Sequence, residues 1–188
     1  DFTNLHSDQF RIRDSSLLKY VSQGALKLEK ALDRFGVDAN GVTALDVGLS
    51  TGGFSDLLLQ RGAKKILGID VGQGQLHKDL QSNDKLQAFD KVNARHPLPN
   101  SLLQSFFGEE EQCFDLIVVD VSFISLSLIV PNLVNYLRRG GFLIVLVKPQ
   151  FELSKKDLNK KGVVKDEESR NLALEKILGV FQQNALKQ

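Results

Sequence analysis

The amino-acid sequence predicts an α/β fold, in which helices cover both faces of a mostly parallel sheet. Three observations lead to this prediction. Short segments that are apolar nearly throughout alternate along the chain with segments of helical periodicity. A glycine-rich turn follows the first apolar segment. The chain has 188 residues, which is the length of one domain, since domains commonly hold about 100 to 200 residues.

The first helix is expected at residues 23–35, before any strand. Leu28, Leu32 and Phe35 lie there at helical spacing, and Gly36 follows as a stop signal. The segment that comes next predicts one strand-turn-helix unit, made of a strand at 42–47, a glycine-rich turn at 48–53 and a helix at 54–61.

The alternation continues through the rest of the chain. We expect strands at 65–71, 86–89, 114–120 and 142–148, and helices at 76–80, 102–107, 131–139 and 166–178. The helix at 131–139 is expected to end with basic residues and a pair of glycines, as the helix dipole and the C-cap prefer. Asp166 is the expected N-cap of the last helix.

Composition excludes several classes of protein. Hydrophobic residues make up 42% and charged residues 25%, so the chain is neither disordered nor fibrous. Its 24 basic and 23 acidic residues balance to a formal net charge of +1, which indicates no general basic field for nucleic acid or membrane. No apolar run approaches the roughly 18 residues of a membrane span. The single cysteine, Cys113, favours a reducing compartment, for which the cytoplasm is expected.

Ligands of an open parallel sheet bind at the carboxyl ends of its strands. The turn at 46–54 places Gly48, Gly52 and Gly53 there with the spacing G-x-x-x-G-G, which differs from the dinucleotide fingerprint G-x-G-x-x-G. This spacing favours a ligand without pyrophosphate, although glycines in a tight turn without any ligand are the alternative.

Two further polar residues at strand ends are consistent with an adenosine ligand. Asp70 follows Asp46 by 24 residues, close to the roughly 20-residue interval at which a carboxylate meets a ribose diol in such sheets. Asn93 could contact adenine through its amide, and an Asx-turn explains that residue equally well. No residue pattern predicts a metal site.

Lys148 stands directly after six apolar residues, so its charge is expected at the rim of the site. Asp120 ends the preceding predicted strand in the same way. The alternatives are a lysine that extends to solvent or a structural ion pair of Lys148 with Asp120. Lys27, on the first helix, reads from the sequence alone as an ordinary exposed lysine.

The sequence resembles the TlyA family of bacterial ribosomal-RNA ribose methyltransferases, often labelled haemolysins, whose catalytic domain is similar to FtsJ. The resemblance covers about 150 residues and is carried by the motifs Y-V-S-Q-G-A-L-K-L-E-K-A-L at 20–32, A-L-D-V-G-L-S-T-G-G-F at 44–54, D-V-G-Q-G-Q-L-H at 70–77, N-A-R at 93–95, D-V-S-F-I-S-L at 120–126, L-V-K-P-Q-F-E at 146–152 and K-G-V-V-K-D at 161–166.

This resemblance implies a Rossmann-like methyltransferase fold with S-adenosylmethionine as the methyl donor. It also implies a Lys-Asp-Lys-Glu set that methylates the 2′-hydroxyl of a ribose, cytidine in the family, in ribosomal RNA or in assembled ribosomal subunits. Lys27, Asp120 and Lys148 match the first three members. The residues expected to bind the donor are Asp46, Gly48, Ser50, Thr51, Gly52, Gly53, Phe54, Asp70, Val71 and Asn93.

The match with the family is incomplete at both ends. The fourth member, a glutamate in a G-N-x-E stretch, has no counterpart here, and Glu152 does not replace it. The final strand pair has none either. Residues 1–22 are expected to be the exit from an N-terminal RNA-binding domain, and residues 23–188 an FtsJ-like methyltransferase domain that is incomplete at its C-terminus. The absence of methionine also indicates that the native start is missing.

A mechanism follows as a hypothesis. Lys148 would accept the proton of the ribose hydroxyl, with its pKa lowered by Lys27, while Asp120 orients it. Base methylation is disfavoured, because D-V-S-F stands where an N-P-P-Y type turn would serve an exocyclic amine. Cys113 lies at the opposite end of its strand from the site, so it cannot form 5-methylcytosine there.

RNA would be recruited by phosphate contacts beside the site. Lysines 155, 156, 160, 161 and 165 are the candidates, and a solvated loop is the alternative interpretation. Phe123 and Phe151 are candidates for stacking on bases, although each phenylalanine could equally belong to the core.

Three other functions are alternatives to ribose methylation. A nicotinamide-dependent oxidoreductase needs the pyrophosphate fingerprint, which is absent. A methyltransferase-like module that binds RNA or the donor without turnover is favoured only by the missing glutamate. A pore-forming haemolysin is disfavoured, because the sequence holds no membrane-spanning or strongly amphipathic segment.

Overall fold

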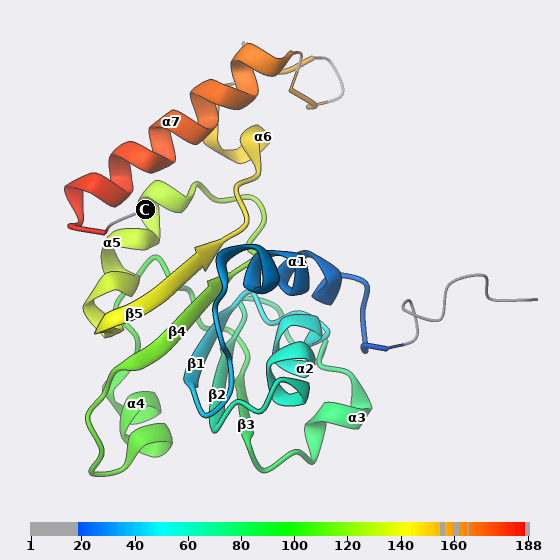
Figure 1. Ribbon diagram of the computed structural model, residues 1–188, viewed down its shortest axis with the longest axis vertical. Helices are drawn as coiled ribbons and strands as arrows, with labels where there is room; N and C mark the ends of the chain where they lie inside the picture. The colour runs from blue at the N-terminus through cyan, green and yellow to red at the C-terminus, as the bar shows by residue number, and fades with distance from the viewer. Residues whose placement is uncertain (1–18, 155–156, 160–161, 165, 187–188) are drawn as a thin grey trace, which may run out of the picture.

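The chain forms a five-stranded parallel sheet in the computed structural model, which describes residues 19–154, 157–159, 162–164 and 166–186 (Figure 1). The strands are β1 (Thr43–Val47), β2 (Lys65–Ile69), β3 (Leu86–Phe89), β4 (Phe114–Val119) and β5 (Leu137–Val145). The helices are α1 (Ala25–Phe35), α2 (Gly53–Gln60), α3 (Lys78–Gln81), α4 (Asn100–Phe107), η3 (Leu126–Leu128), α5 (Val130–Leu133), η4 (Val134–Tyr136), α6 (Pro149–Glu152) and α7 (Glu167–Gln183).

The strand order is β3-β2-β1-β4-β5, and every neighbouring pair is parallel. The chain therefore builds the sheet outward from β1 to β3, returns to the other side of β1, and continues outward through β4 and β5. Connections leave β1 and β4 in opposite directions, which makes the carboxyl ends of these two strands the switch point where ligands bind in such sheets.

Both faces of the sheet are buried along β1, β2 and β4, as the apolar strands predict, whereas no residue of the edge strand β5 is fully buried. In β4, Leu116 and Val118 pack with α1 and α2, whereas Ile117 and Val119 pack with α4, α5 and α7. All four side chains are fully buried. Alternate residues of one strand thus supply the two separate cores of a three-layer domain (Figure 1), and the predicted fold class is confirmed.

The prediction of one helix over 131–139 is wrong. Helical structure ends at Tyr136, and β5 begins at Leu137, which pairs with Phe114 of β4. Arg138 lies in β5, where its Nη1 forms an ion pair of 3.2 Å with Oδ1 of Asp115 on β4. The register of the two strands shifts here, and a Cβ at Gly141 would lie only 2.7 Å from the carbonyl oxygen of Asp115. The glycines therefore permit a bulge in the sheet and do not cap a helix.

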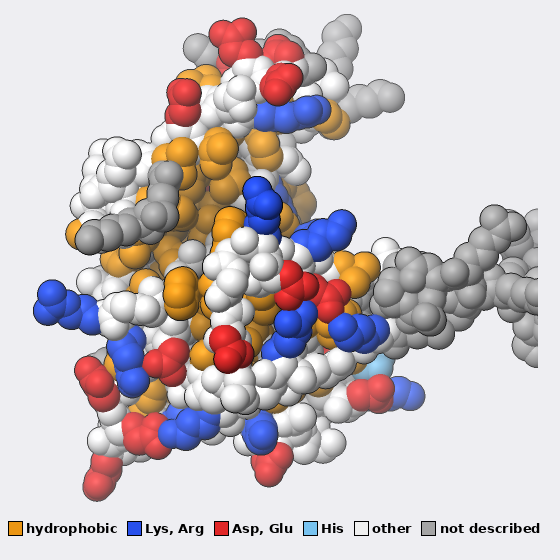
Figure 2. Space-filling view, viewed as in Figure 1, with side chains coloured by type: hydrophobic (Ala, Val, Ile, Leu, Met, Phe, Trp, Pro, Cys, Tyr) orange, Lys and Arg blue, Asp and Glu red, His pale blue; other side chains and the backbone are white. Residues whose placement is uncertain are grey.

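The last helix, α7, begins as predicted and continues to Gln183. The carboxylate of Asp166 accepts a hydrogen bond of 2.8 Å from the backbone N–H of Ser169, so Asp166 is its N-cap. Figure 2 shows apolar side chains gathered between α7 and the sheet. Within the ranges given above, no helix has the length and apolar character of a membrane span.

Candidate active site

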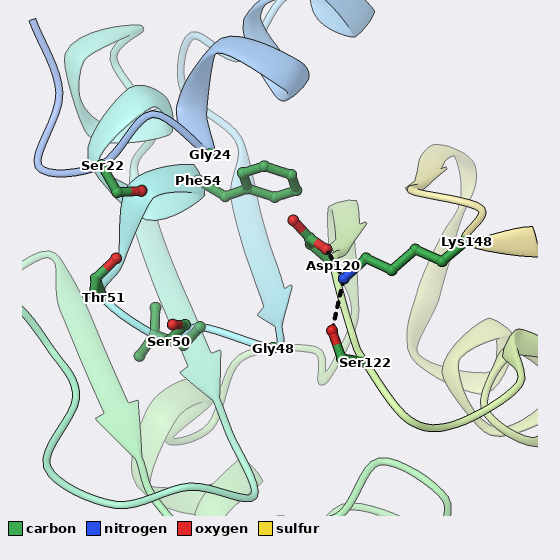
Figure 3. Close-up of a pocket in the computed structure, with 11 residues that line it drawn as sticks. Ser22, Gly24, Gly48, Ser50, Thr51, Phe54, Asp120, Ser122 and Lys148 are labelled. Atoms are coloured by element: carbon green, nitrogen blue, oxygen red, sulfur yellow. Dashed lines mark hydrogen bonds and ion pairs between the residues drawn. The ribbon is translucent and has the colours of Figure 1, made fainter. Parts of the chain in front are cut away.

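A cavity of about 230 Å³ lies over the carboxyl ends of β1 and β4 (Figure 3). Its walls come from four places in the sequence: the segment before α1, the glycine-rich turn with the start of α2, the segment after β4, and the segment after β5. The lining residues are Ser22, Gly24, Gly48, Leu49, Ser50, Thr51, Gly53, Phe54, Asp120, Ser122 and Lys148.

The glycines of the first turn allow these four segments to meet. Gly48 has φ +88°, and a Cβ on it would collide with the carbonyl oxygen of Asp120. A Cβ on Gly53 would collide with the side chain of Ser22. The turn therefore needs glycine for close approach of other segments, which goes beyond the requirement of a tight turn alone.

Five of the ten residues predicted to bind the donor line this cavity, and Asp46 is one of the five that do not. It is 1% exposed and lies in the interior at the base of the turn. Its Oδ2 accepts a hydrogen bond of 2.7 Å from the hydroxyl of Ser55, while its Oδ1 has no partner. Burial raises the pKa of Asp46 to about 7, and the charges of Asp120 and Asp70 add to this effect.

Asp70 shapes the same turn from the end of β2. Its Oδ2 accepts a hydrogen bond of 2.8 Å from the N–H of Ser50, and its Oδ1 accepts one of 2.7 Å from Gly72. Val71 beside it is 68% exposed. The side-chain oxygen of Asn93 accepts a hydrogen bond of 3.0 Å from the N–H of Arg95. This contact is the Asx-turn expected as the alternative to an adenine contact. Asp70, Val71 and Asn93 lie outside the cavity lining, as does Gly52.

Two of the three residues predicted to be catalytic, Lys27 and Lys148, contact the carboxylate of the third, Asp120. The Nζ of Lys148 lies 2.6 Å from Oδ1 of Asp120, and the Nζ of Lys27 lies 3.3 Å from Oδ2. The side chain of Lys27 is 52% exposed, whereas those of Asp120 and Lys148 are 18% and 21% exposed. Asp120 therefore joins an amine of α1 to an amine of the segment after β5. Asp120 and Lys148 line the cavity, whereas Lys27 lies outside its lining.

Ser122 is a member of the site that the sequence did not single out. Its hydroxyl oxygen accepts a hydrogen bond of 2.9 Å from Nζ of Lys148 (Figure 3). The available signal was its position two residues after Asp120, in the turn that leaves β4 at the switch point. A serine in such a turn is common without any function, which is why it passes unnoticed.

Several other predicted features lie elsewhere. Cys113 directly precedes β4, at the amino end of the sheet and away from the cavity, and its Sγ accepts a hydrogen bond from Arg138. Phe123 is 91% exposed beside the site, with its ring centroid 5.2 Å from that of Phe151. The lysines proposed to contact phosphate (155, 156, 160, 161 and 165) lie outside the described residues, as does most of the predicted N-terminal segment.

The cavity fits a sulfonium nucleoside better than a dinucleotide. Its lining includes Gly48 and Gly53, its turn lacks the pyrophosphate fingerprint, and two members of a Lys-Asp-Lys cluster, Asp120 and Lys148, line it. Together with the strand order, these features define the class of S-adenosylmethionine-dependent methyltransferases of Rossmann-like fold.

Comparison with known proteins gives the family. The model of the FtsJ-like methyltransferases matches residues 20–187, and the chain belongs to this family. The predicted methyl donor, S-adenosylmethionine, is confirmed at the level of the family. An S-adenosylmethionine-dependent methyltransferase from Mesorhizobium loti shares the fold, with a TM-score of 0.51 at 16% identity over 66% of this chain and 55% of the other.

More similar relatives carry two kinds of name. The 16S/23S rRNA (cytidine-2′-O)-methyltransferase TlyA of Mycobacterium tuberculosis is 40% identical over 80% of this chain and 53% of its own length. Hemolysin A of Brachyspira hyodysenteriae is 38% identical over 86% of this chain and 66% of its own. A solved hemolysin-labelled protein from Lactococcus lactis is 40% identical over 89% of this chain and 76% of the other, with a TM-score of 0.80. The chain spans about half the length of the TlyA relative.

Proposed function

We propose that the protein containing this chain transfers a methyl group from S-adenosylmethionine to the 2′-hydroxyl of a ribose in ribosomal RNA, at cytidine. The observation that carries the proposal is that Lys27 and Lys148 both contact Asp120, and that Asp120 and Lys148 line the cavity formed by the glycine-rich turn. The name of the TlyA relative supports the choice of cytidine and of ribosomal RNA.

The bound donor supplies an activated methyl group. The backbone of the glycine-rich turn, together with Ser50, Thr51 and Phe54, would hold it in the cavity. Asp70 would accept hydrogen bonds from the ribose hydroxyls of the donor. Each of its oxygens already accepts one backbone N–H, and a carboxylate oxygen has room for a second hydrogen bond.

Lys148 would accept the proton that leaves the ribose hydroxyl. A neutral amine has two N–H bonds and one lone pair, and Lys148 has two acceptors within reach, Asp120 and Ser122. If both N–H bonds point to these acceptors, the lone pair remains for the incoming proton.

Phe123 would support the base of the acceptor nucleotide. Its ring is almost fully exposed next to Ser122, where a base turned out of its RNA helix could stack. Residues 1–22 would lead from an RNA-binding domain into the methyltransferase domain at 23–188, and assembled ribosomal subunits are a further candidate substrate. The chain spans about half of the TlyA relative, so these assignments concern the whole protein.

The test is to identify the methylated nucleoside. The full-length protein is incubated with unmodified ribosomal RNA and isotopically labelled S-adenosylmethionine, and the RNA is then digested to nucleosides for mass spectrometry. Label in 2′-O-methylcytidine is the expected result. Label in a base would contradict the proposal, and donor binding without any transfer would favour the binding module instead.

A further inference from the structure

One buried carboxylate has no part in the chemistry above. Glu152, at the end of α6, is 4% exposed. Its Oε1 accepts a hydrogen bond of 2.9 Å from the N–H of Leu126, and its Oε2 accepts one from the hydroxyl of Ser125. A carboxylate held in the interior is costly unless it is well bonded, so its two bonds to a single loop point to a role in placing that loop.

The loop at residues 120–126 contacts the segment at residues 148–152 in three successive places. Nearest the cavity, Lys148 binds Asp120 and Ser122. One step further out, the ring of Phe151 packs near that of Phe123. Furthest out, Glu152 binds Ser125 and Leu126. Residues 120–126 and 148–152 therefore run alongside each other, and these contacts join the turn after β4 to the segment that carries the proposed base, Lys148.

The loop needs support from its surroundings. Phe123 has φ +64°, a backbone conformation that is strained for a bulky residue and persists only where the neighbouring structure holds it. Glu152 binds the loop two and three residues after Phe123. Glu152 is itself held in place, because Nζ of Lys176 on α7 donates a hydrogen bond of 2.7 Å to its backbone carbonyl.

We propose that Glu152 is a positioning residue, which holds the loop at 120–126 so that Asp120 and Ser122 keep the amine of Lys148 aimed at the acceptor hydroxyl. This inference rests on the proposed function and adds a residue to it. Displacement of a reacting group by about 1 Å can slow an enzyme about a hundredfold, so a contact outside the cavity lining can still affect the rate.

The first test is kinetic and uses the full-length protein. Glu152→Gln keeps the size of the side chain but cannot accept both hydrogen bonds, and Ser125→Ala is a milder change in the same contact. We expect kcat to fall about tenfold to a hundredfold in Glu152→Gln, with donor affinity unchanged. The double variant should be no slower than Glu152→Gln alone, because both changes remove one interaction.

Tyr136→Phe is the matched control for loss of stability. The Tyr136 oxygen accepts a hydrogen bond of 2.9 Å from the N–H of Leu98, away from the loop at 120–126. This variant should unfold at a lower temperature but keep the kcat of the wild-type protein. An equal kcat for wild type and Glu152→Gln would overturn the proposal, as would a loss of kcat in Tyr136→Phe as large as that in Glu152→Gln.

The second test does not require turnover. Lysine acetylation is followed residue by residue with mass spectrometry, and Lys64, exposed at the other end of the sheet, is the internal reference. Lys148 should react several-fold faster in Glu152→Gln than in wild type, because its partners are no longer held. Equal rates would overturn the role of Glu152. A wild-type protein that fails to methylate RNA would instead overturn the proposed function, and the acetylation result would still stand.

Discussion

Asp120 is the centre of the candidate site, because its two oxygens contact one amine of α1 and one amine of the segment after β5. Their positions at the ends of apolar segments are what select Asp120 and Lys148 as candidates from the sequence. Lys27 is different, because it is an exposed lysine on an amphipathic helix and only the resemblance to the TlyA family selects it. Its contact with Asp120 spans 93 residues, a separation that no local pattern can report.

Asp46 makes stability depend on pH. Its pKa is raised to about 7 in the folded protein, so the folded state keeps a proton that the unfolded chain releases near the ordinary value of 3.8. Stability contributed by this group is therefore lost as pH rises from about 4 to about 7 and levels off above that range. Asp46→Asn should remove this contribution to the slope, as urea unfolding at pH 5 and pH 8 would show.

The control for this prediction is Asp84→Asn, which neutralises an exposed aspartate. That variant should keep the pH dependence of the wild-type protein. If Asp46→Asn also kept it, the buried carboxylate would titrate normally, and the account of its environment would be wrong.

At the scale of elements, the first strand-turn-helix unit is nearly as predicted, because its apolar run, glycines and helix stop are all local signals. The helix at 131–139 fails for a non-local reason. Arg138 and the glycines after it resemble a helix end in sequence, yet pairing with β4 and the ion pair to Asp115 place them in a strand. Helix α6 is a single turn after Lys148, too short to produce a periodic pattern.

The glycine-rich turn gives a prediction with a matched control. Gly48→Ala and Gly74→Ala each place alanine at positive φ, which costs about 1 to 3 kcal/mol. Only at Gly48 would the new methyl group meet Asp120, since nothing lies within 4 Å at Gly74. We therefore expect Gly48→Ala to lower unfolding stability more than Gly74→Ala and to abolish donor binding. Equal stability losses in denaturant unfolding, with donor binding retained, would contradict this assignment of the turn.

At the scale of the whole molecule, the topology explains why such distant residues meet. The chain adds β2 and β3 on one side of β1 and then β4 and β5 on the other (Figure 1). The turns after β1 and β4 therefore line one cavity. Helix α1 brings Lys27 to the same place from the face that it covers. The sequence predicts the layers of this fold from strand and helix periodicity. It does not predict that Ser122 and Glu152 contact the segments around Lys148, because those contacts join separate elements.

The nature of the cavity predicts which cofactor stabilises the fold. At a concentration of about 100 times its Kd, S-adenosylmethionine should add about 2.7 kcal/mol to the unfolding free energy. That gain corresponds to a rise in Tm of about 5 to 10 °C for a domain of this size. NADH should leave Tm unchanged, because the turn lacks the pyrophosphate fingerprint. A rise with NADH and none with S-adenosylmethionine in thermal unfolding would support the oxidoreductase instead.

The most direct test of the account compares methyl transfer with donor binding in Lys148→Ala of the full-length protein, with Lys64→Ala as the control. Removing the proton acceptor should slow single-turnover transfer by a factor of about 10² to 10⁴, while the Kd for S-adenosylmethionine stays near that of the wild type. Lys64→Ala should match the wild type in both measurements. Transfer by Lys148→Ala at the wild-type rate would show that the cluster of two amines and one carboxylate is not the catalytic centre.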